Sequence, residues 1–146
     1  MSLTDEQQRA WRSLVLVTHA IEEALDRQSR RDGGIPHAYY KLLVFLYEGR
    51  SGETRMSQLA DQLGYSTSRL THAIASLQRS GWVTRERSEA DRRVQLVSIT
   101  DAGVAIVRAV TPGQVREVRE PAVGALSAED AGTLERLTAA IRVALT

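Results

Sequence analysis

The stretch MSQLADQLGYSTSRLTHAIASLQRSGWVTRE, residues 56–86, decides the fold of this 146-residue chain. Its first part carries apolar residues at helical spacing and stops at Gly64. Its second part begins at Ser66, a residue type that favours helix N-caps, and stops at Gly81. Two short helices joined by about three residues around a glycine are typical of a helix-turn-helix. The pattern therefore predicts a helix-turn-helix whose second helix spans residues 66–80.

The period of the sequence changes directly behind this pair of helices. Residues 82–87 (WVTRER) and 94–99 (VQLVSI) have the pattern of strands, and the polar residues 88–93 (SEADRR) separate them as a turn. A two-stranded hairpin placed directly after a helix-turn-helix is the wing of a winged helix. The fold class that we expect is therefore mainly α (α+β), a winged helix-turn-helix.

Two further helices are predicted before residue 56. Thr4 and Gln7 form a capping-box pattern. Apolar residues at helical spacing follow until the polar segment 27–34 (RQSRRDGG), where we expect the first helix to fade. The next helix spans about residues 36–48 and is apolar on nearly every side, so it should be buried. Residues 49–54 (GRSGET) are expected to form a loop.

Two helices are also predicted behind the hairpin. Thr100 or Asp101 should cap the first, which Pro112 should kink because proline removes a backbone hydrogen bond from the helical ladder. This helix should end near Gly124, and Ser127 should open the last helix. The chain is thus expected to contain six helices, with one β-hairpin between the fourth helix and the fifth helix.

The outer helices carry apolar stripes that one small domain cannot bury by itself. Such stripes would pair well with the same helices of a second copy, which predicts a twofold homodimer. A length of 146 residues suits one compact domain. We therefore predict a single domain over residues 1–146, with dimerisation helices in 1–35 and 101–146 and a winged helix-turn-helix lobe in 36–100.

The composition limits the possible classes of protein. Hydrophobic residues make up 42% of the chain and charged residues 25%, which is ordinary for a soluble globular domain. The chain contains no cysteine, which excludes disulfides, thiolate zinc sites and thiol catalysis. There is no apolar run of about 18 residues, and the polar start does not resemble a secretory signal. We expect a cytoplasmic protein with no cofactor, no bound metal and no membrane partner.

Positive charge is concentrated in one part of the chain. The net charge is only +1, but residues 65–93 hold six arginines against three acidic side chains, so the remainder is net negative. Such a cluster suits a polyanion, although an arginine-rich solvated surface would show the same charge pattern.

Two stretches resemble the MarR family of transcriptional regulators: residues 56–86, quoted above, and residues 90–103 (ADRRVQLVSITDAG), which are similar to the family's wing. The turn at 88–93 departs from the family pattern, because many members have a proline after an aspartate there. The resemblance covers the chain from about Trp11 to the C-terminus. It implies a triangular dimer, repression as the common outcome, and control by small aromatic or phenolic ligands bound between the DNA-binding lobe and the dimer helices.

The start of the predicted second helix carries the candidate DNA contacts. With Leu70, Ile74 and Leu77 facing the core, short hydroxyl and cationic side chains face outward, and these suit base edges and phosphates. The helix N-terminus can also hold a phosphate through its free N–H groups. An ordinary exposed helix face is the alternative. The candidates are Ser66, Thr67, Ser68, Arg69, Thr71 and His72, and the family resemblance places the main base contacts near Thr71 and His72.

The wing carries a second set of candidates at its tip. An arginine there can enter a narrow minor groove, where the electrostatic potential is most negative. The resemblance favours Arg93 for the groove and Arg92 for a phosphate or for pairing with Asp91. Asp91 itself should brace the turn, because a carboxylate is repelled by phosphate. Three other arginines remain open between a backbone contact and a solvated surface: Arg79, Arg85 and Arg87.

A ligand pocket is expected from aromatic side chains near a histidine or an arginine, which suit a planar carboxylate or phenol. Core packing is the competing explanation for Tyr39 and Tyr40, because their helix must be buried anyway. Trp11 and Arg108 are similar to a tryptophan and an arginine of the urate-responsive branch of the family, but its other pocket residues have no match here. The pocket candidates are Trp11, His37, Tyr40 and Arg108, with Tyr39 and Trp82 as further aromatic residues.

An enzyme and a winged helix that binds protein are the two alternatives to a DNA-binding regulator. Three scattered histidines, without a zinc-protease motif, a glycine-rich phosphate loop or a supported catalytic triad, argue against an enzyme. A winged helix that binds protein instead of DNA is the remaining alternative, but it would not need hydroxyls and arginines at the start of the second helix. The sequence therefore predicts a homodimeric regulator that binds double-stranded DNA at a pseudo-palindrome with half-sites about 10 bp apart.

Overall fold

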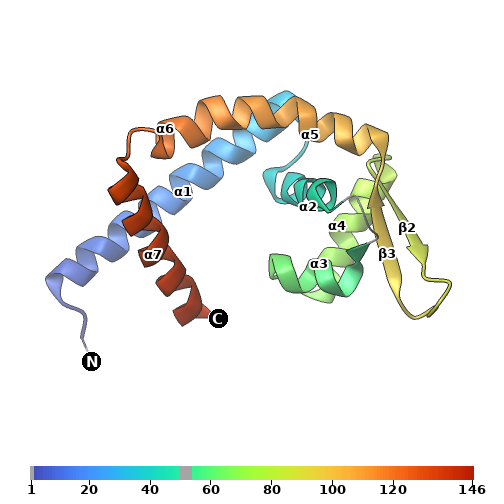
Figure 1. The fold of residues 1–146 in the computed structure, drawn as a ribbon, viewed down its shortest axis with the longest axis horizontal. Coiled ribbons are helices and arrows are strands. Elements are labelled where there is room, and N and C mark those ends of the chain that lie inside the picture. The colour runs from blue at the N-terminus through green and yellow to red at the C-terminus, as the bar shows by residue number, and fades with distance from the viewer. Residues whose placement is uncertain (1, 50–53) are drawn as a thin grey trace.

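A computed structural model describes residues 2–49 and 54–146. The winged-helix lobe lies at one end of the molecule, the first half of α1 and all of α7 lie at the other, and α5 crosses between them (Figure 1). In chain order, the elements are α1 Asp5–Gly33, α2 His37–Glu48, β1 Thr54–Arg55, α3 Met56–Leu63, α4 Thr67–Arg79, β2 Val83–Arg87, β3 Gln95–Ile99, α5 Asp101–Gln114, the π-helix η1 Val115–Arg119, α6 Glu120–Val123 and α7 Ala128–Leu145.

The predicted helix starts are confirmed. Thr4 and Gln7 form a reciprocal capping box at the start of α1, Ser66 caps α4, Thr100 caps α5 and Ser127 caps α7. Each side-chain oxygen accepts a hydrogen bond from a backbone N–H that the helix leaves without a partner. These caps define where α1, α4, α5 and α7 begin.

The first helix does not fade in its polar segment, as expected, but continues to Gly33. Gln28 and Ser29 are buried there, and the Gln28 side-chain amide donates to the Val110 carbonyl of α5 at 2.9 Å. The polar segment is helical because it packs against α5, a contact that periodicity cannot reveal. Gly34 then ends the helix in the left-handed region, at φ 63°, which glycine adopts without steric cost.

Pro112 lies inside α5, and the helix continues beyond it. The change that follows is one of helix type: η1 has π-helical hydrogen bonding, with the N–H of Glu120 donating to the carbonyl of Val115. The helix, in which a kink at Pro112 was predicted, thus continues through the proline and changes its hydrogen-bond register at Val115–Arg119. The predicted end of the helix is confirmed, because Gly124 is its C-cap.

The sheet has three antiparallel strands in the order β1-β3-β2. The predicted hairpin forms β2 and β3, in which Val83 lies opposite Ile99. The strand β1 was not predicted. Its first residue, Thr54, pairs with Val97 of β3 but belongs to residues 49–54, which were expected to form a loop. Residues 50–53 of that expected loop lie outside the described residues.

The wing is joined tightly to α5. The N–H of Thr100 donates to the Trp82 carbonyl at 3.1 Å, and its hydroxyl donates to the Gly81 carbonyl at 2.7 Å. A Cβ on Gly103 would lie 2.2 Å from the Trp82 carbonyl oxygen, so only glycine fits here. The base of the wing is therefore fixed against the first turn of α5.

The core fills the winged-helix lobe and leaves the first half of α1 and all of α7 uncovered. Buried side chains from α2, α3, α4 and the sheet meet there, including Leu43, Leu59, Ile74 and Val97. By contrast, α7 has no buried residue. Large apolar side chains are exposed on both outer helices: Trp11, Val15, Leu16 and Val17 of α1, and Leu134, Leu137, Ile141, Val143 and Leu145 of α7.

Candidate DNA-binding face and ligand cavity

The outward face of α4 is polar because its inward face is fixed by the core. Leu70, Ile74 and Leu77 are buried, so the intervening side chains near the helix start are exposed. The Ser66 hydroxyl accepts the Arg69 N–H at 3.2 Å, which leaves the hydroxyl proton free to donate. The structure thus exposes every α4 residue that the sequence placed on DNA: Ser66, Thr67, Ser68, Arg69, Thr71 and His72.

Two hollows flank the first turns of α4. One, of about 540 Å³, lies between α4 and the start of α2 and is lined by Ser66, Ser68, Arg69 and His72 with Tyr39 and Tyr65. The other, of about 360 Å³, lies between α4 and the wing and is lined by Thr67, Thr71, Arg85 and Arg93 together with apolar neighbours. Thr67 and Thr71 of the helix thus share a hollow with Arg85 and Arg93 of the wing, whereas Arg92 lines neither hollow.

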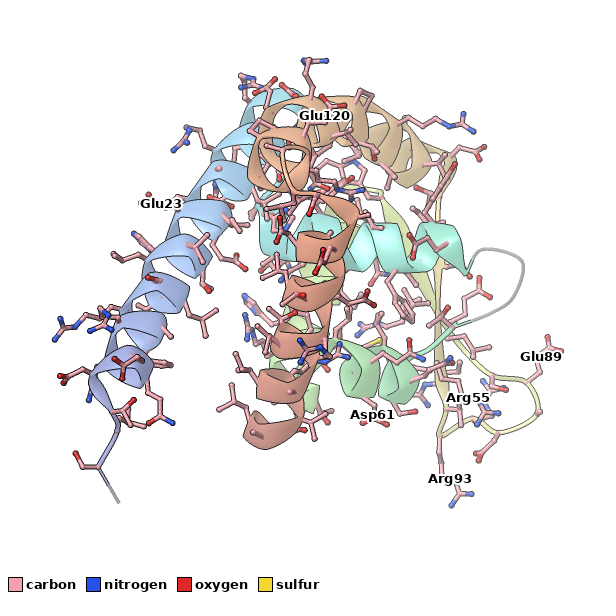
Figure 2. The ribbon with its side chains drawn as sticks, turned by 60° about the vertical axis from the view of Figure 1, so that its left-hand side comes forward. Glu23, Arg55, Asp61, Glu89, Arg93 and Glu120 are labelled. Carbon is pink, nitrogen blue, oxygen red and sulfur yellow. The ribbon has the colours of Figure 1, made fainter. Side chains whose placement is uncertain are left out.

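The wing tip is a turn braced by Asp91. Its carboxylate accepts the Arg93 backbone N–H at 3.1 Å and the Arg93 guanidinium at 3.2 and 3.3 Å. These bonds from Arg93 hold the pKa of Asp91 below its usual value. The expected pairing of Arg92 with Asp91 is wrong, because the neighbouring Arg93 takes this position while its side chain stays 91% exposed. Figure 2 shows Arg93 extending beyond the tip of the wing.

Arg55 is a cation near this face that the sequence analysis missed. It lies on β1, opposite Leu96 of β3, and its charge helps to lower the pKa of Asp91 (Figure 2). Since β1 is only two residues long, no alternation in the sequence indicated a strand there. The sheet pairing therefore adds a positive charge beside the wing from a segment outside the arginine-rich stretch.

A third hollow, a cavity of about 530 Å³, lies where α1, α2, η1 and α6 meet. Most of its surface is apolar, and three charged side chains, Lys41, Glu48 and Arg119, are exposed at its edge. The remaining lining residues are Ile21, Leu25, His37, Tyr40, Val44, Phe45, Leu63, Gln114, Val118, Ala122 and Val123.

Two buried polar side chains in this cavity have an atom without a hydrogen-bond partner, Nδ1 of His37 and Nε2 of Gln114. Burial lowers the pKa of His37, and nearby Lys41 lowers it further, so the imidazole is neutral at pH 7. Gln114 accepts a hydrogen bond from Arg119 through Oε1 at 2.8 Å, which directs its amide nitrogen elsewhere. Each atom has almost no solvent-accessible surface, so a group in the cavity could reach it only after a side chain moves.

The structure brings two of the four predicted pocket residues to this cavity, His37 and Tyr40. Trp11 and Arg108 do not line it, because Trp11 is 57% exposed on the outer part of α1 and Arg108 is exposed on α5. Tyr39 lines the hollow beside α4 instead, and Trp82 packs against the core. Gln114 and Arg119 were missed, since only the crossing of α5 and η1 over α1 brings them near His37.

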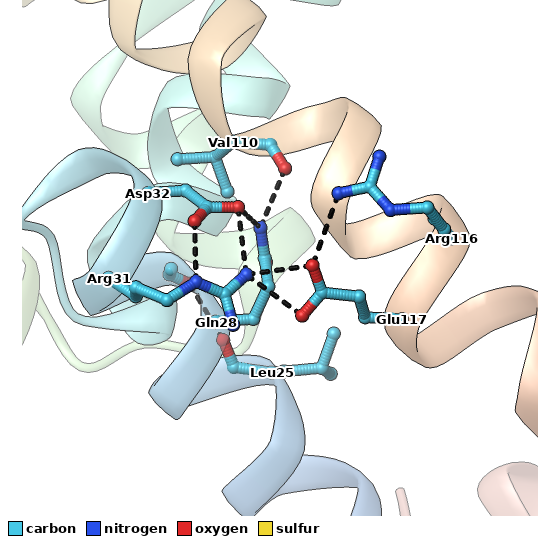
Figure 3. Close-up of polar contacts among 8 residues, drawn as sticks. Leu25, Gln28, Arg31, Asp32, Val110, Arg116 and Glu117 are labelled. Atoms are coloured by element: carbon cyan, nitrogen blue, oxygen red, sulfur yellow. Dashed lines mark hydrogen bonds and ion pairs between the residues drawn. The ribbon is translucent and has the colours of Figure 1, made fainter.

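A polar network fastens α1 to the helix that forms one wall of the cavity (Figure 3). Arg31 donates to Asp32 at 2.8 Å and to Glu117 of η1 at 2.8 Å, and Gln28 bridges Asp32 and Val110. The Arg31 and Gln28 contacts lower the pKa of Asp32. Across residues 2–49 and 54–146, no three His, Asp or Glu side chains gather as a metal site would require. Nor is any described helix long and apolar enough to span a membrane.

A helix-turn-helix followed by a β-hairpin, with arginines exposed on both, defines the winged-helix class of proteins. A sequence model of the MarR family matches residues 33–94. The chain is similar to Sco3205, a MarR family regulator from Streptomyces coelicolor solved in complex with DNA, with 38% identity and a TM-score of 0.94 over 100% of this chain and 92% of that one. It is also similar to AbsC, a MarR family regulator from the same organism, with 32% identity and a TM-score of 0.91 over 99% of this chain and 97% of that one. The chain therefore belongs to the MarR family.

A curated relative supports the same assignment. The transcriptional repressor MprA of Escherichia coli is 26% identical over 125 residues, which cover 84% of this chain and 70% of that protein. Other curated regulators match over 87 residues, and this match spans about half of their length, 52%.

Proposed function

We propose that this protein binds double-stranded DNA sequence-specifically as a homodimer and acts as a ligand-responsive repressor. The observation that carries the proposal is that Thr67 and Thr71 of α4 line a hollow together with Arg93 of the wing, while Arg69 and His72 line a second hollow at the same helix start. A helix in the major groove with an arginine beside it is a recurring arrangement for reading DNA. The DNA complex of Sco3205 and the repressor MprA support this reading.

The chemistry of the α4 face fits both parts of DNA recognition. Ser66 and the free N–H groups at the helix start suit a phosphate. The Thr71 hydroxyl donates to the Thr67 carbonyl at 2.8 Å, so its oxygen remains an acceptor for a base amine. Arg93, held by Asp91 at the wing tip, suits the minor groove. Arg92 is exposed at the same turn and suits a phosphate.

A homodimer follows from the uncovered helices. The stripe Leu134, Leu137 and Ile141 on α7 is 41–50% exposed, and 18 residues of helix without a buried side chain are marginal in water. Residues 1–35 and 101–146 are therefore proposed to form the dimer interface, and residues 36–100 the DNA-binding lobe. Two lobes related by a dyad require a pseudo-palindromic operator with half-sites about 34 Å apart.

The cavity suits a small anionic aromatic ligand. Apolar walls and the cations Lys41 and Arg119 are complementary to a ring that carries a carboxylate or a phenol, while Glu48 at the same edge opposes a second negative charge. Because the cavity joins α1 and α2 to η1 and α6, an occupant would shift the lobe relative to the dimer helices. A ligand that favours the wrong spacing of the two lobes weakens operator binding.

The test of DNA binding is a titration with DNA from upstream of the protein's own gene, at two salt concentrations, with random DNA as control. We expect at least a hundred-fold preference and a steep loss of affinity with salt. Arg93→Glu should weaken binding strongly, whereas Arg108→Glu, an equal charge change outside both DNA-face hollows, should not. Equal weak binding to both DNAs would contradict the proposal, and unchanged DNA affinity of Arg93→Glu with loss of a protein partner would favour a protein-binding winged helix.

The ligand site is tested separately, with salicylate as an anionic probe and salicylamide as its uncharged analogue. We expect salicylate to release operator DNA and salicylamide to be much weaker. Ala122→Trp should abolish the salicylate effect by filling the cavity, and Ala125→Trp, just beyond the lining residues, serves as control. Release of DNA from Ala122→Trp as readily as from wild type would place the ligand elsewhere.

A further inference from the structure

Tyr65 lies at the junction of three helices and contacts each of them. Its backbone N–H donates to the Ala60 carbonyl of α3 at 3.0 Å, which is possible because Gly64 adopts the left-handed region, at φ 67°. Its hydroxyl donates to the Ala38 carbonyl of α2 at 3.2 Å. Its ring lies under the guanidinium of Arg69 on α4, with Cζ 4.5 Å from the ring centroid. Both ends of the side chain are thus held in place.

The contact with the ring orders Arg69 without occupying its hydrogen-bond donors. A guanidinium that stacks on an aromatic ring uses its face, while its five N–H groups point outward in the plane. No ion pair joins Arg69 to a carboxylate of the described residues. Arg69 is exposed and lines the hollow beside the start of α4, together with Ser66 and His72. Its donors therefore stay available on the face that the proposed function assigns to DNA.

We propose that Tyr65 is a positioning residue for DNA recognition: its ring holds the Arg69 guanidinium at the start of α4 with the N–H donors free for the DNA backbone. This inference rests on the proposed function, since it assumes that the α4 face meets DNA. An unrestrained arginine loses side-chain entropy when it binds, and the ring removes part of that loss in advance. Tyr65 was not among the predicted contacts, because in sequence it is only the residue before an N-cap.

The test combines Tyr65→Met, which fills similar space without a ring, with Tyr65→Phe, which keeps the ring and loses the hydroxyl. In the free protein, the NMR signals of the Arg69 side chain should show a ring-current shift in wild type and Tyr65→Phe, and none in Tyr65→Met. In DNA binding, Tyr65→Met should weaken affinity about 2- to 5-fold, the range of an exposed cation–π contact. Tyr65→Phe should restore most of this affinity.

A double-mutant cycle separates positioning from a structural effect. In the Arg69→Ala background, which itself should cost about tenfold, Tyr65→Met should have no further effect. Additive losses, or a Tyr65→Met protein that binds as wild type does, would overturn the inference. Should Tyr65→Met unfold, Tyr65→Leu replaces it both in the cycle and as the variant without a ring in the ring-current comparison.

The same cycle on random DNA keeps the two proposals apart. Contacts to phosphate do not depend on base sequence, so the coupling between Tyr65 and Arg69 should appear there as well. Absence of any preference for promoter DNA, with the coupling intact, would refute sequence-specific regulation and leave the role of Tyr65 standing. A strong promoter preference without the coupling would refute the role of Tyr65 and leave sequence-specific regulation standing.

Discussion

His37 shows how one buried side chain makes the stability of the protein depend on pH. Its backbone N–H donates to Asp26 at 2.9 Å, and its ring lies 5.8 Å from the Tyr40 ring at the cavity wall. Burial, with Lys41 nearby, holds the pKa of His37 below the usual 6.5. As pH falls below about 6.5, the unfolded chain takes up a proton before the folded protein does, so the free energy of unfolding decreases until pH passes the folded pKa.

We therefore expect wild type to lose more stability than His37→Gln between pH 7 and pH 5.5. The difference is at most about 1.4 kcal/mol per pH unit, the limit for one proton. Urea unfolding at a fixed protein concentration measures it. His19→Gln is the matched control, because His19 is exposed on α1. A His37→Gln protein as sensitive to pH as wild type would show that His37 does not set this dependence.

Asp91 offers a second test. Its negative charge should weaken DNA binding, whereas its hydrogen bonds to Arg93 should strengthen it. A carboxylate near DNA is repelled by phosphate, so removal of Glu89 at the same turn should leave affinity unchanged or raise it slightly. Asp91→Ala should instead lower affinity a few-fold, about 1 kcal/mol, because it releases Arg93 from three hydrogen bonds. The measurement is DNA affinity at low salt. Equal gains in affinity for Asp91→Ala and Glu89→Ala would mean that the brace contributes nothing.

At the level of elements, the joint between the wing and α5 depends on Gly103. Gly103→Ala places a methyl group against the Trp82 carbonyl oxygen, a backbone atom that cannot rotate away. We expect a loss of about 1–3 kcal/mol in the free energy of unfolding, as for overpacking elsewhere. Gly132→Ala on α7, where a Cβ meets nothing within 4 Å, should instead stabilise by about 0.5–1 kcal/mol through helix propensity. Thermal unfolding of both variants checks this, and equal destabilisation would contradict it.

The elements were predictable where local chemistry determines them. Capping side chains such as Ser66 and Ser127 act on N–H groups two or three residues away, so each helix start could be identified from the sequence. The elements that differed depend on distant partners. β1 exists only because Thr54 meets Val97, and the polar end of α1 is helical because Gln28 reaches Val110. The sequence pattern of β1, or of the polar end of α1, does not indicate that such a distant partner exists.

At the level of the whole molecule, the uncovered face of α7 would couple folding to assembly in the proposed dimer. Leu137→Glu puts a charge in the middle of the apolar stripe, whereas Arg136→Glu puts one on the opposite side of the same helix. We expect Leu137→Glu to shift the protein to monomers in analytical ultracentrifugation and to lower its melting temperature. For wild type and Arg136→Glu, the melting temperature should rise with protein concentration. A dimeric Leu137→Glu would contradict the assigned interface.

The two sites differed in how far the sequence could define them. The candidate DNA contacts on α4 lie together at one helix start, so helical period alone indicates that they point away from the buried Leu70, Ile74 and Leu77. The cavity combines His37 of α2 with Gln114 of α5 and Arg119 of η1, which are far apart in sequence. Trp11 and Arg108 were chosen for their chemistry, and neither lies at the cavity in this chain. Such a site forms only when long helices pack together, and the residue types within one segment do not show which distant segment will pack against it.

The tight joint at Gly103 also gives the protein an optical reporter of its own. The chain has two tryptophans, and they lie at opposite ends of the molecule. Trp82 is at the joint, where its environment should change if α4, the wing and α5 move relative to one another, while Trp11 lies on the outer helix α1. In a Trp11→Phe protein, intrinsic emission would follow the DNA-reading lobe; in a Trp82→Phe protein it would follow subunit association. Movement of the lobe and assembly could then be timed independently, without an attached dye.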